Sequence, residues 1–186
     1  QKYREGAWQP YAKDELVDVL VQDVLTTPPY VRISRMIRDI SATDILVGNK
    51  HTNLRQMVEQ ELTSEDVASR VQEIRFREIN QQQVRAAELT LQDFVYTTAV
   101  SDEHFLQWVT TDNKIAGFCR LSLPHWDKLT ASACDVTANE LLVQPGQAMI
   151  RELHVYGQAL SLGSEGMSAQ HQGLGQKLLA KASSIA

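Results

Sequence analysis

The chain has 186 residues, a hydrophobic fraction of 43% and a formal net charge of −5 at pH 7. This composition is ordinary for a globular protein and excludes an intrinsically disordered chain, while the negative charge excludes attraction of nucleic acid by the surface as a whole. No run of about 18 apolar residues occurs, so we expect no membrane span, and the first residues show no signal-peptide pattern.

The first 80 residues predict two helices and two extended segments. Apolar side chains recur on one helical face over Lys13–Thr26, and a Pro-Pro pair follows, so we expect a helix there. Apolar and polar residues alternate over 30–40, which predicts a strand or extended segment with a polar face of Arg32, Ser34, Met36 and Arg38. A short helix is expected from a cap at Asn53 through Leu62, and an extended segment over 71–79.

From about residue 80 the pattern changes to strands. Three β-like runs are predicted, over residues 88–100, 105–110 and 114–123. Polar triplets at 101–103 and 111–113 separate these runs, and Asp112-Asn113 suits a hairpin turn.

The end of the chain predicts an insertion, a strand and a helix. The polar stretch 124–147 is interpreted as a surface insertion, and Met149–Tyr156 as a strand that Gly157 ends. The buried stripe of the last helix is expected to be Leu174, Leu178, Leu179, Ala182 and Ile185. Because this helix reaches Ala186 without a glycine cap or a proline, and the chain begins without Met, we expect the protein to continue past both ends.

The turn Gln170-His171-Gln172-Gly173-Leu174-Gly175 opens the last helix and predicts a pyrophosphate-binding site. Glycine allows a tight turn and leaves no Cβ between the peptide N–H groups and an anion. The first N–H groups of a helix lack intrahelical partners, and the helix dipole places positive charge there. An ordinary glycine turn into a helix is the alternative, because Gly-x-Gly before a helix is common.

Four strands, a glycine turn and a helix in this order resemble the front half of the GNAT acyltransferase fold, whose Gln/Arg-x-x-Gly-x-Gly/Ala motif holds the pyrophosphate of acetyl-CoA. The resemblance implies an α/β (α+β) fold that is incomplete at the C-terminus, with its fifth strand past Ala186. We therefore divide the chain into a helical and extended linker segment, 1–80, and the front part of a GNAT-like acetyltransferase domain, 81–186, with the insertion 124–147.

A longer run, Arg151-Glu152-Leu153-His154-Val155-Tyr156-Gly157 before the glycine turn, resembles the catalytic subunit of Elongator and its single-chain bacterial and archaeal relatives. Earlier segments resemble that family in the same order: Tyr3-Arg4-Glu5-Gly6, Pro28-Pro29-Tyr30-Val31-Arg32, Arg38-Asp39-Ile40, His51-Thr52-Asn53-Leu54-Arg55 and Arg75-Phe76-Arg77-Glu78. The resemblance covers nearly the whole chain except residues 124–147.

This resemblance implies a tRNA-modifying enzyme with two catalytic halves. Members of the family join a radical-SAM domain, with S-adenosylmethionine and a 4Fe-4S cluster, to a GNAT-like acetyltransferase domain. They bind tRNA and use acetyl-CoA to build a carboxymethyl-type group on C5 of the wobble uridine, and the GNAT-like domain hydrolyses acetyl-CoA when tRNA is present. The resemblance also implies a cytoplasmic protein with accessory Elongator subunits or a second copy of itself as partners.

The chain departs from this family in three places. Its two cysteines, Cys119 and Cys134, are too few for a cluster that needs three, so we expect reduced thiols here and a radical-SAM half that precedes Gln1 or is missing. Val71 stands where many relatives place a cysteine that ligates a structural zinc, so we expect no metal. The tyrosine-rich segment that contacts the acetyl group would follow Ala186, so this fragment alone is expected to be inactive.

The predicted acetyl-CoA site combines the last strand with the glycine turn. Its residues are Glu152, Leu153, His154, Val155, Gln170, His171, Gln172, Gly173, Leu174 and Gly175. Alternation places Glu152, His154 and Tyr156 on one face of the strand, and Arg151, Leu153 and Val155 on the other. Glu152 and His154 are candidates for acid–base catalysis, since histidine titrates near neutral pH; a hydrogen-bonded structural histidine is the alternative.

Contacts with tRNA phosphates are expected from Arg32, Arg35, Arg38, Lys50 and Arg55, because guanidinium pairs with phosphate in a bidentate way. A solvated face, or ion pairs to another domain, is the alternative. The tryptophans Trp8, Trp108 and Trp126 could stack on bases, but packing is the favoured interpretation.

Three functions therefore remain open. The leading hypothesis is the acetyl-CoA-binding part of an acyltransferase that forms 5-carboxymethyl-type uridine on tRNA. One alternative is a GNAT N-acetyltransferase that acts on a lysine or another amine, because a fold does not fix its substrate. The other is a tRNA-binding module without enzymatic activity.

Overall fold

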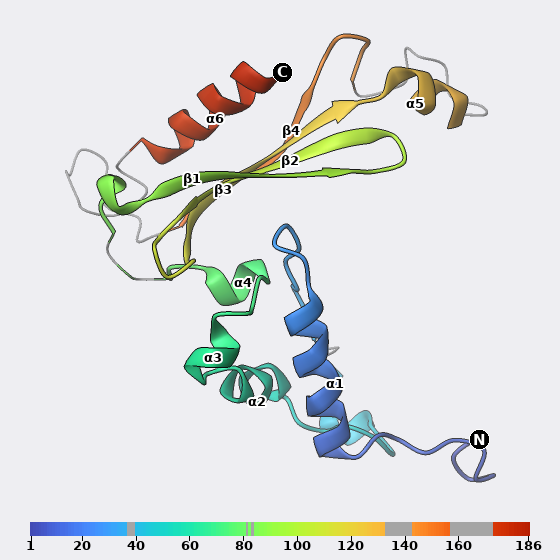
Figure 1. Cartoon of the computed structure of the whole chain (residues 1–186). Helices are drawn as coiled ribbons and strands as arrows, with labels where there is room; N and C mark the ends of the chain where they lie inside the picture. The colour runs from blue at the N-terminus through green and yellow to red at the C-terminus, as the bar shows by residue number, and fades with distance from the viewer. Residues whose placement is uncertain (37–39, 81, 83, 133–142, 157–172) are drawn as a thin grey trace. The chain divides into compact units, whose positions relative to one another are not determined.

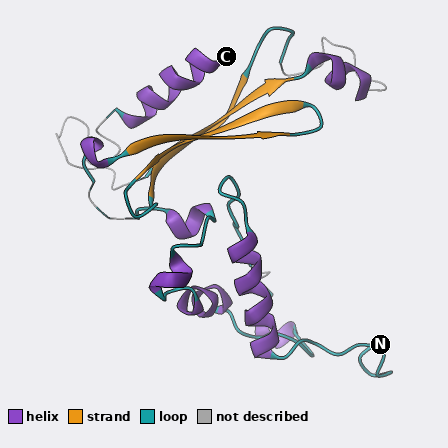
Figure 2. Cartoon of the chain, viewed as in Figure 1, coloured by secondary structure: helices purple, strands orange, loops and turns teal. Residues whose placement is uncertain are grey.

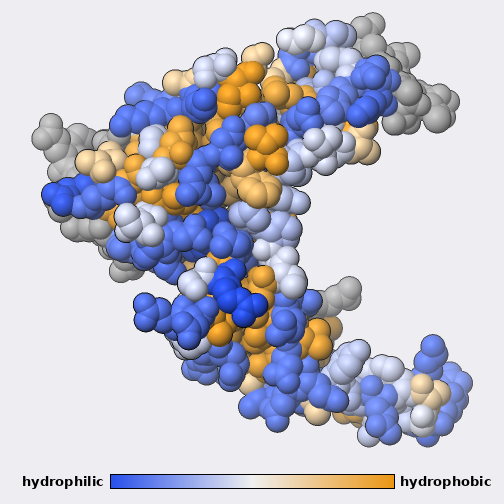
Figure 3. Space-filling model, in the orientation of Figure 1, coloured by the Kyte–Doolittle hydropathy of each residue, from blue (hydrophilic) through white to orange (hydrophobic). Residues whose placement is uncertain are grey.

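The computed structural model describes residues 1–36, 40–80, 82, 84–132, 143–156 and 173–186. The chain divides into two compact units, Gln1–Arg77 and Glu78–Ala186. Among the described residues, the regular elements of the first unit are helices, and the strands lie in the second unit (Figures 1 and 2). Hydrophilic residues cover most of the visible surface of each unit, and hydrophobic surface shows in patches among them (Figure 3). Within the described ranges, no helix is long and apolar enough to cross a membrane.

The first unit is built around two helices that pack on each other. Its helical elements are α1 (Lys13–Thr26), α2 (Leu54–Glu61), α3 (Glu65–Ala68), α4 (Ile74–Arg77) and the 3₁₀ turn η1 (Ala42–Asp44). The expected boundaries of α1 are confirmed. Burial of the apolar faces drives this packing, and the core residues are Val17, Val24, Leu54, Val58, Leu62 and Val71.

Two sequence predictions for this unit are wrong. The described residues 31–36 form no strand, which leaves the extended alternative of that prediction, but Met36 packs against the apolar core, as Ile33 does, although alternation placed it on the polar face. The segment 71–79, expected to be extended, contains the single helical turn α4. Tertiary contacts explain both differences, because the backbone N–H of Ile74 donates to the carbonyl of Val31 across the unit.

A buried carboxylate fixes this arrangement. The Glu73 side chain accepts hydrogen bonds from the backbone N–H of Ile33 at 2.6 Å and of Phe76 at 2.8 Å, one at each oxygen. Arg77 is also buried. Burial lowers the pKa of Arg77 to about 10, and the negative charge of Glu73 opposes that shift, so Arg77 is charged at neutral pH. The carboxylate thus supplies an acceptor to two partly buried amides.

The second unit is an α+β arrangement with one antiparallel sheet. Its strands, in the spatial order β1-β2-β3-β4, are β1 (Thr90–Thr97), β2 (Ser101–Val109), β3 (Ile115–Pro124) and β4 (Met149–Val155). Its helical elements are the 3₁₀ turn η2 (Ala86–Glu88), α5 (Trp126–Ser132) and α6 (Leu174–Ile185). The helix α5 lies inside the segment predicted as a surface insertion.

The two hairpin turns differ in how well the sequence predicts them. The backbone N–H of Thr110 donates to the carbonyl of Lys114 at 2.9 Å, and Asn113 has a φ of +63°, so the expected turn at 112–113 is confirmed. The polar triplet 101–103 was expected to separate two strands, and this is wrong, because it lies inside β2. The turn precedes it, where Thr98 N–H donates to the carbonyl of Ser101 at 2.8 Å.

Helix α6 covers one face of the sheet (Figure 1). Leu174, Leu178 and Ala182 are buried in it, and Ile185 packs against the same core, as expected. Leu179 is 37% exposed, so its place in the buried stripe was predicted wrongly. The buried Leu174, Leu178 and Ala182 are spaced four residues apart, so the buried stripe is narrower than predicted.

Strands β3 and β4 approach each other most closely at Gly117. A Cβ atom on Gly117 would lie 2.9 Å from the carbonyl oxygen of His154 and 3.3 Å from the Cα of Val155. Real Cβ atoms essentially never come within 3.0 Å of another heavy atom, so the contact with the His154 oxygen is excluded. Glycine is therefore required for β4 to pair with β3 at this position.

We predict that Gly117→Ala lowers the free energy of unfolding by about 1–3 kcal/mol, since the added methyl group must push β4 away from β3. Urea unfolding followed by circular dichroism measures the change. Gly175→Ala is the matched control, because its Cβ would stand 3.5 Å from Val155 Cγ2, an ordinary contact. Equal stabilities for the two variants would contradict this account.

We further predict that Glu73→Gln costs about 1–3 kcal/mol of unfolding free energy, because an amide has one acceptor oxygen and one of the two partly buried N–H groups loses its partner. Thermal unfolding monitored by calorimetry would reveal the loss. Glu61→Gln, at an exposed glutamate in the same unit, is expected to change stability by less than about 0.5 kcal/mol. A loss of the same size in both variants would refute the role of Glu73.

Candidate acetyl-CoA site

The described part of the glycine turn lies at the N-terminus of α6. Gly173 has φ +67° and ψ 20°, in the left-handed region that favours glycine. The backbone N–H of Lys177 donates to the Gly173 carbonyl at 3.1 Å, so the N–H groups of the residues between them have no acceptor within the helix. Such groups can bind an anion. The other predicted turn residues, Gln170, His171 and Gln172, lie outside the described residues.

The first turn of α6 packs against β4. A Cβ built on Gly175 would stand 3.5 Å from Val155 Cγ2 and 4.0 Å from Leu153 Cδ2. Leu153 and Val155 therefore point toward α6, as the alternation of the strand predicted. The structure thus places the N-terminus of α6 next to Leu153 and Val155, two of the four predicted strand residues.

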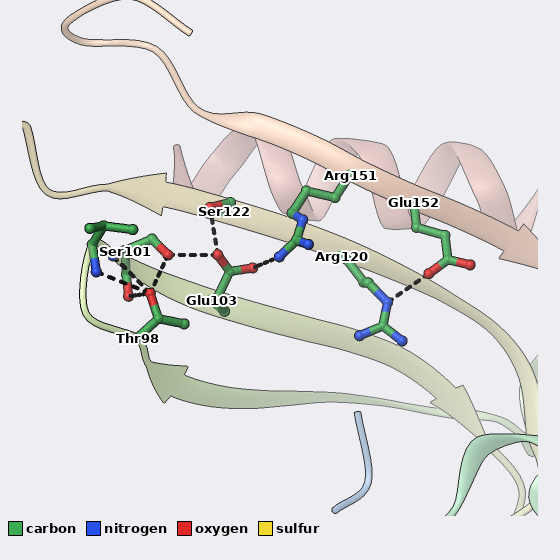
Figure 4. Close-up of polar contacts among 8 residues, drawn as sticks. Thr98, Ser101, Glu103, Arg120, Ser122, Arg151 and Glu152 are labelled. Carbon is green, nitrogen blue, oxygen red and sulfur yellow. Dashed lines mark hydrogen bonds and ion pairs between the residues drawn. The ribbon is translucent and has the colours of Figure 1, made fainter. Parts of the chain in front are cut away.

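Glu152 and His154 lie on the opposite face of β4, where Glu152 links two basic side chains. Arg120 on β3 donates from Nε to Glu152 Oε2 at 2.7 Å, and the other carboxylate oxygen lies 3.0 Å from His154 Nε2 (Figure 4 shows the arginine contact). The Glu152 carboxylate therefore lies between the guanidinium of Arg120 and the imidazole of His154, and its contact with His154 orients the imidazole.

Aromatic rings hold the imidazole of His154. It stacks on Phe118 with ring centroids 5.3 Å apart, and on Tyr156 with centroids 6.2 Å apart. The Tyr156 hydroxyl donates to Glu78 at 3.1 Å. The His154 side chain is still 53% exposed, so it is both fixed in orientation and accessible.

Arg120 is a site residue that the sequence analysis missed. Its guanidinium carbon lies 5.2 Å from the ring centre of Phe105 and 5.4 Å from that of Phe118, within reach of cation–π interaction. A signal was available, because an arginine two residues after a buried Phe118 lies on the same face of a strand. The pairing with Glu152 could not be read from the sequence, because it depends on the register of β3 with β4.

The predicted face of Arg151 is wrong, because β4 contains a bulge. Arg120 pairs with Glu152 and Leu121 with Ile150, so Arg151 has no partner on β3. In such a bulge two residues oppose one, and the strict alternation of faces is lost. Arg151 consequently reaches the same face as Glu152 and donates from Nη1 to Glu103 Oε2 at 3.3 Å.

The buried Glu103 is the second residue that the sequence analysis missed. Its Oε1 accepts hydrogen bonds from the hydroxyls of Ser101 at 2.7 Å and Ser122 at 2.6 Å, while Oε2 faces Arg151 (Figure 4). The Ser101 hydroxyl also lies 2.7 Å from that of Thr98. The carboxylate is therefore held by neutral donors on one oxygen and by a cation on the other.

The predicted tRNA-contacting residues belong to the first unit, and one of them, Arg55, binds the main chain. Arg55 donates from Nη2 to the carbonyl of Ile33 at 2.6 Å and pairs with Glu59 at 3.0 Å. Arg75 donates to the carbonyl of Ser34 at 3.3 Å. Arg55 thus braces the segment that carries Arg32 and Arg35, both exposed.

The remaining predicted basic residues are Lys50, which is exposed, and Arg38, which lies outside the described residues. Trp8 is exposed, Trp108 packs against the core of the second unit, and Trp126 begins α5. Cys119 is a buried thiol whose pKa is raised by burial, so it is protonated at neutral pH. Among the described residues, no cluster of three or more His, Cys, Asp or Glu side chains could hold a metal ion.

Comparisons with known proteins agree on one family. Residues 1–64 match the radical_SAM C-terminal domain. Over its full length, the chain is 37% identical to a tRNA uridine(34) acetyltransferase of Dehalococcoides mccartyi and covers 39% of that protein. It is 30% identical over 192 residues to Elongator complex protein 3 of Schizosaccharomyces pombe, and 27% identical to the human protein of that name.

A solved structure shares the fold. The archaeal Methanocaldococcus infernus Elp3 with N-terminus deletion (1-46) superposes with a TM-score of 0.77 and 26% sequence identity, over 99% of this chain and 42% of that one. The chain spans 39% of the D. mccartyi relative and about a third (33%) of the S. pombe one. The similarity therefore covers both units of this chain and a minority of each relative.

Proposed function

This chain corresponds to a C-terminal portion of Elp3-like proteins, and on that premise we propose that it is the acetyl-CoA-binding part of an enzyme that modifies the wobble uridine of tRNA. The observation that carries the proposal is the contact of the α6 N-terminus with β4, at Gly175. This contact places the N-terminus of α6, which can bind an anion, next to β4. One edge of β4 pairs with β3, and no described strand pairs with its other edge. The name of the D. mccartyi relative supplies the substrate class, a tRNA uridine.

The second unit is the front of a GNAT-like fold in this proposal. Four antiparallel strands in sequential order, followed by a helix on one face, agree with that architecture. The first unit, whose residues 1–64 match the radical_SAM C-terminal domain, would join it to the radical-SAM half of the full-length protein. That half would bring S-adenosylmethionine and a 4Fe-4S cluster.

The pyrophosphate of acetyl-CoA would bind at the start of α6. The left-handed Gly173 has no Cβ, and a Cβ built there would meet only Gln176 Oε1, at 3.8 Å, among atoms within 4 Å. The N–H groups of Leu174 and Gly175 precede the first bonded amide of the helix. Partial positive charge and unpartnered donors together favour a phosphate at this position.

The pantetheine would lie along β4, over Glu152–Val155. In the described sheet β4 pairs with β3 alone, and a strand at a sheet edge turns alternate N–H and C=O groups outward. Pantetheine contains two amides and can bind such an edge as an added strand would. The edge runs between the faces, so ligand contact here is compatible with the α6 contacts of Leu153 and Val155.

His154 is the proposed base for hydrolysis of acetyl-CoA. Its Nε2 lies against Glu152, which leaves Nδ1 as the ring nitrogen that takes a proton. Water would attack the thioester carbonyl as His154 removes its proton, and the C–S bond would break to give acetate and the thiol of coenzyme A. Arg120 holds the Glu152 carboxylate in place, beside the imidazole that becomes protonated.

We predict that the full-length protein hydrolyses acetyl-CoA and that tRNA accelerates the reaction, and that Gly173→Val weakens acetyl-CoA binding by about tenfold or more, since a β-branched residue cannot adopt the left-handed turn without strain. Isothermal titration calorimetry gives the affinity, and release of the free thiol gives the rate.

Gly146→Val is the matched control, because Gly146 has a φ of +80° and a Cβ there meets nothing within 4 Å. It should carry the same backbone strain and bind acetyl-CoA like the wild type. Absence of acetyl-CoA binding by the wild type would overturn the proposal. Acetylated lysine or polyamine formed as fast as acetate would instead favour the N-acetyltransferase, and tRNA binding without acetyl-CoA binding would favour the tRNA-binding module.

For tRNA binding, we predict that Arg32→Gln and Arg35→Gln each weaken affinity and reduce the slope of log K against log salt by about 1, because each removes one phosphate contact. Filter binding at several salt concentrations provides the slope. Arg70→Gln, at an exposed arginine of the same unit, should leave the slope unchanged. Equal effects in all three variants would show a general charge effect and count against a specific surface.

A further inference from the structure

The bulge in β4 comes immediately before the segment proposed to bind acetyl-CoA. Arg151 is the unpaired residue of the bulge, and Glu152 follows it in the chain. A bulge bends its strand and changes the direction of the side chains after it. Whatever fixes the bulge therefore fixes the position of Glu152 and the strand edge beyond it.

The contact of Arg151 with Glu103 crosses the sheet. Arg151 belongs to β4 and Glu103 to β2, and β3 lies between these strands. The arginine side chain thus reaches over β3 to bind the carboxylate (Figure 4). This contact ties the edge strand to a strand that it does not touch through the backbone.

The Glu103 carboxylate is suited to serve as a fixed anchor. Its side chain is only 4% exposed, and the Ser101 and Ser122 hydroxyls come from the two central strands and bind one oxygen. A carboxylate buried to this degree requires compensation of its charge. Arg151 supplies a positive charge at the other oxygen. The buried Glu103 carboxylate therefore needs Arg151 for charge compensation, and Arg151, the unpaired residue of the bulge, is held in place by Glu103.

We infer that Glu103 is a positioning residue for the acetyl-CoA site: by holding Arg151 it sets the β4 bulge and thereby places the strand edge and the Glu152–His154 pair. The inference rests on the proposed function. It concerns the geometry of the site, which the affinity of the folded protein reports; loss of Arg151 also leaves the buried Glu103 carboxylate without its cation and lowers stability.

The two carboxylate oxygens make a selective test possible. Glu103→Gln can keep an acceptor oxygen toward the two serines while it turns an NH₂ group toward Arg151, so it removes the arginine contact alone. We expect an acetyl-CoA Kd and KM about fivefold higher in the full-length protein, a size typical of coupling between contacting residues. Ser122→Ala is the matched control at the other oxygen and should leave Kd near the wild-type value.

Variants of Arg151 separate positioning from folding. Arg151→Gln should raise Kd by the same factor as Glu103→Gln, the double variant should be no weaker than either single variant, and Arg151→Lys should recover part of the affinity. Because Arg151 is half exposed, its variants remain informative even if Glu103→Gln fails to fold.

The outcomes distinguish this inference from the function on which it rests. A wild-type protein that binds no acetyl-CoA overturns the proposed function. A wild-type protein that binds acetyl-CoA, together with an Arg151→Gln variant of equal affinity, overturns the inference alone. Additive losses in the double variant would also overturn it, since Glu103 would then act by a route other than Arg151.

Discussion

The candidate site depends on the pairing of β4 with β3. That register sets Phe118 beside His154 and Arg120 beside Glu152. Close approach of the two strands requires the absence of a side chain at Gly117. Since side chains alternate along a strand, a slip of one residue would turn Glu152 and His154 toward α6 and bring Leu153 and Val155 to the polar face. The register of β4 on β3 therefore decides which side chains lie on each face of β4.

The two faces of β4 and its free edge in the described sheet make different contacts. Leu153 and Val155 pack against the first turn of α6, and so hold the proposed pyrophosphate site next to the strand. Glu152 and His154 join Arg120 and Phe118 on the other face. The bulge adds Arg151 to that face and connects it to Glu103. The proposed ligand uses the third direction, the edge, and competes with neither set of contacts.

In the first unit, charged side chains fix an irregular backbone segment. A short apolar core around α1 and α2 cannot by itself fix the irregular segment that carries Arg32 and Arg35. Side chains complete the backbone hydrogen bonding instead: Glu73 accepts from Ile33 N–H, and Arg55 donates to the Ile33 carbonyl. Buried polar groups with partners on the main chain specify one conformation, because any other leaves them unsatisfied.

The sequence by itself determined the elements whose signals are local. The period of apolar residues placed α1, the Asp-Asn pair placed the hairpin turn, and the motif around His154 indicated the family. Tertiary structure alone decided where polar residues are buried. Ser101 and Glu103 look like a turn in the sequence, yet they lie inside β2, because Ser122 and Arg151 from other strands bind Glu103, and Glu103 accepts the hydroxyl of Ser101. The bulge at Arg151, the short turn of α4 and the exposure of Leu179 depend in the same way on neighbours distant in the chain, and a local pattern carries no information about them.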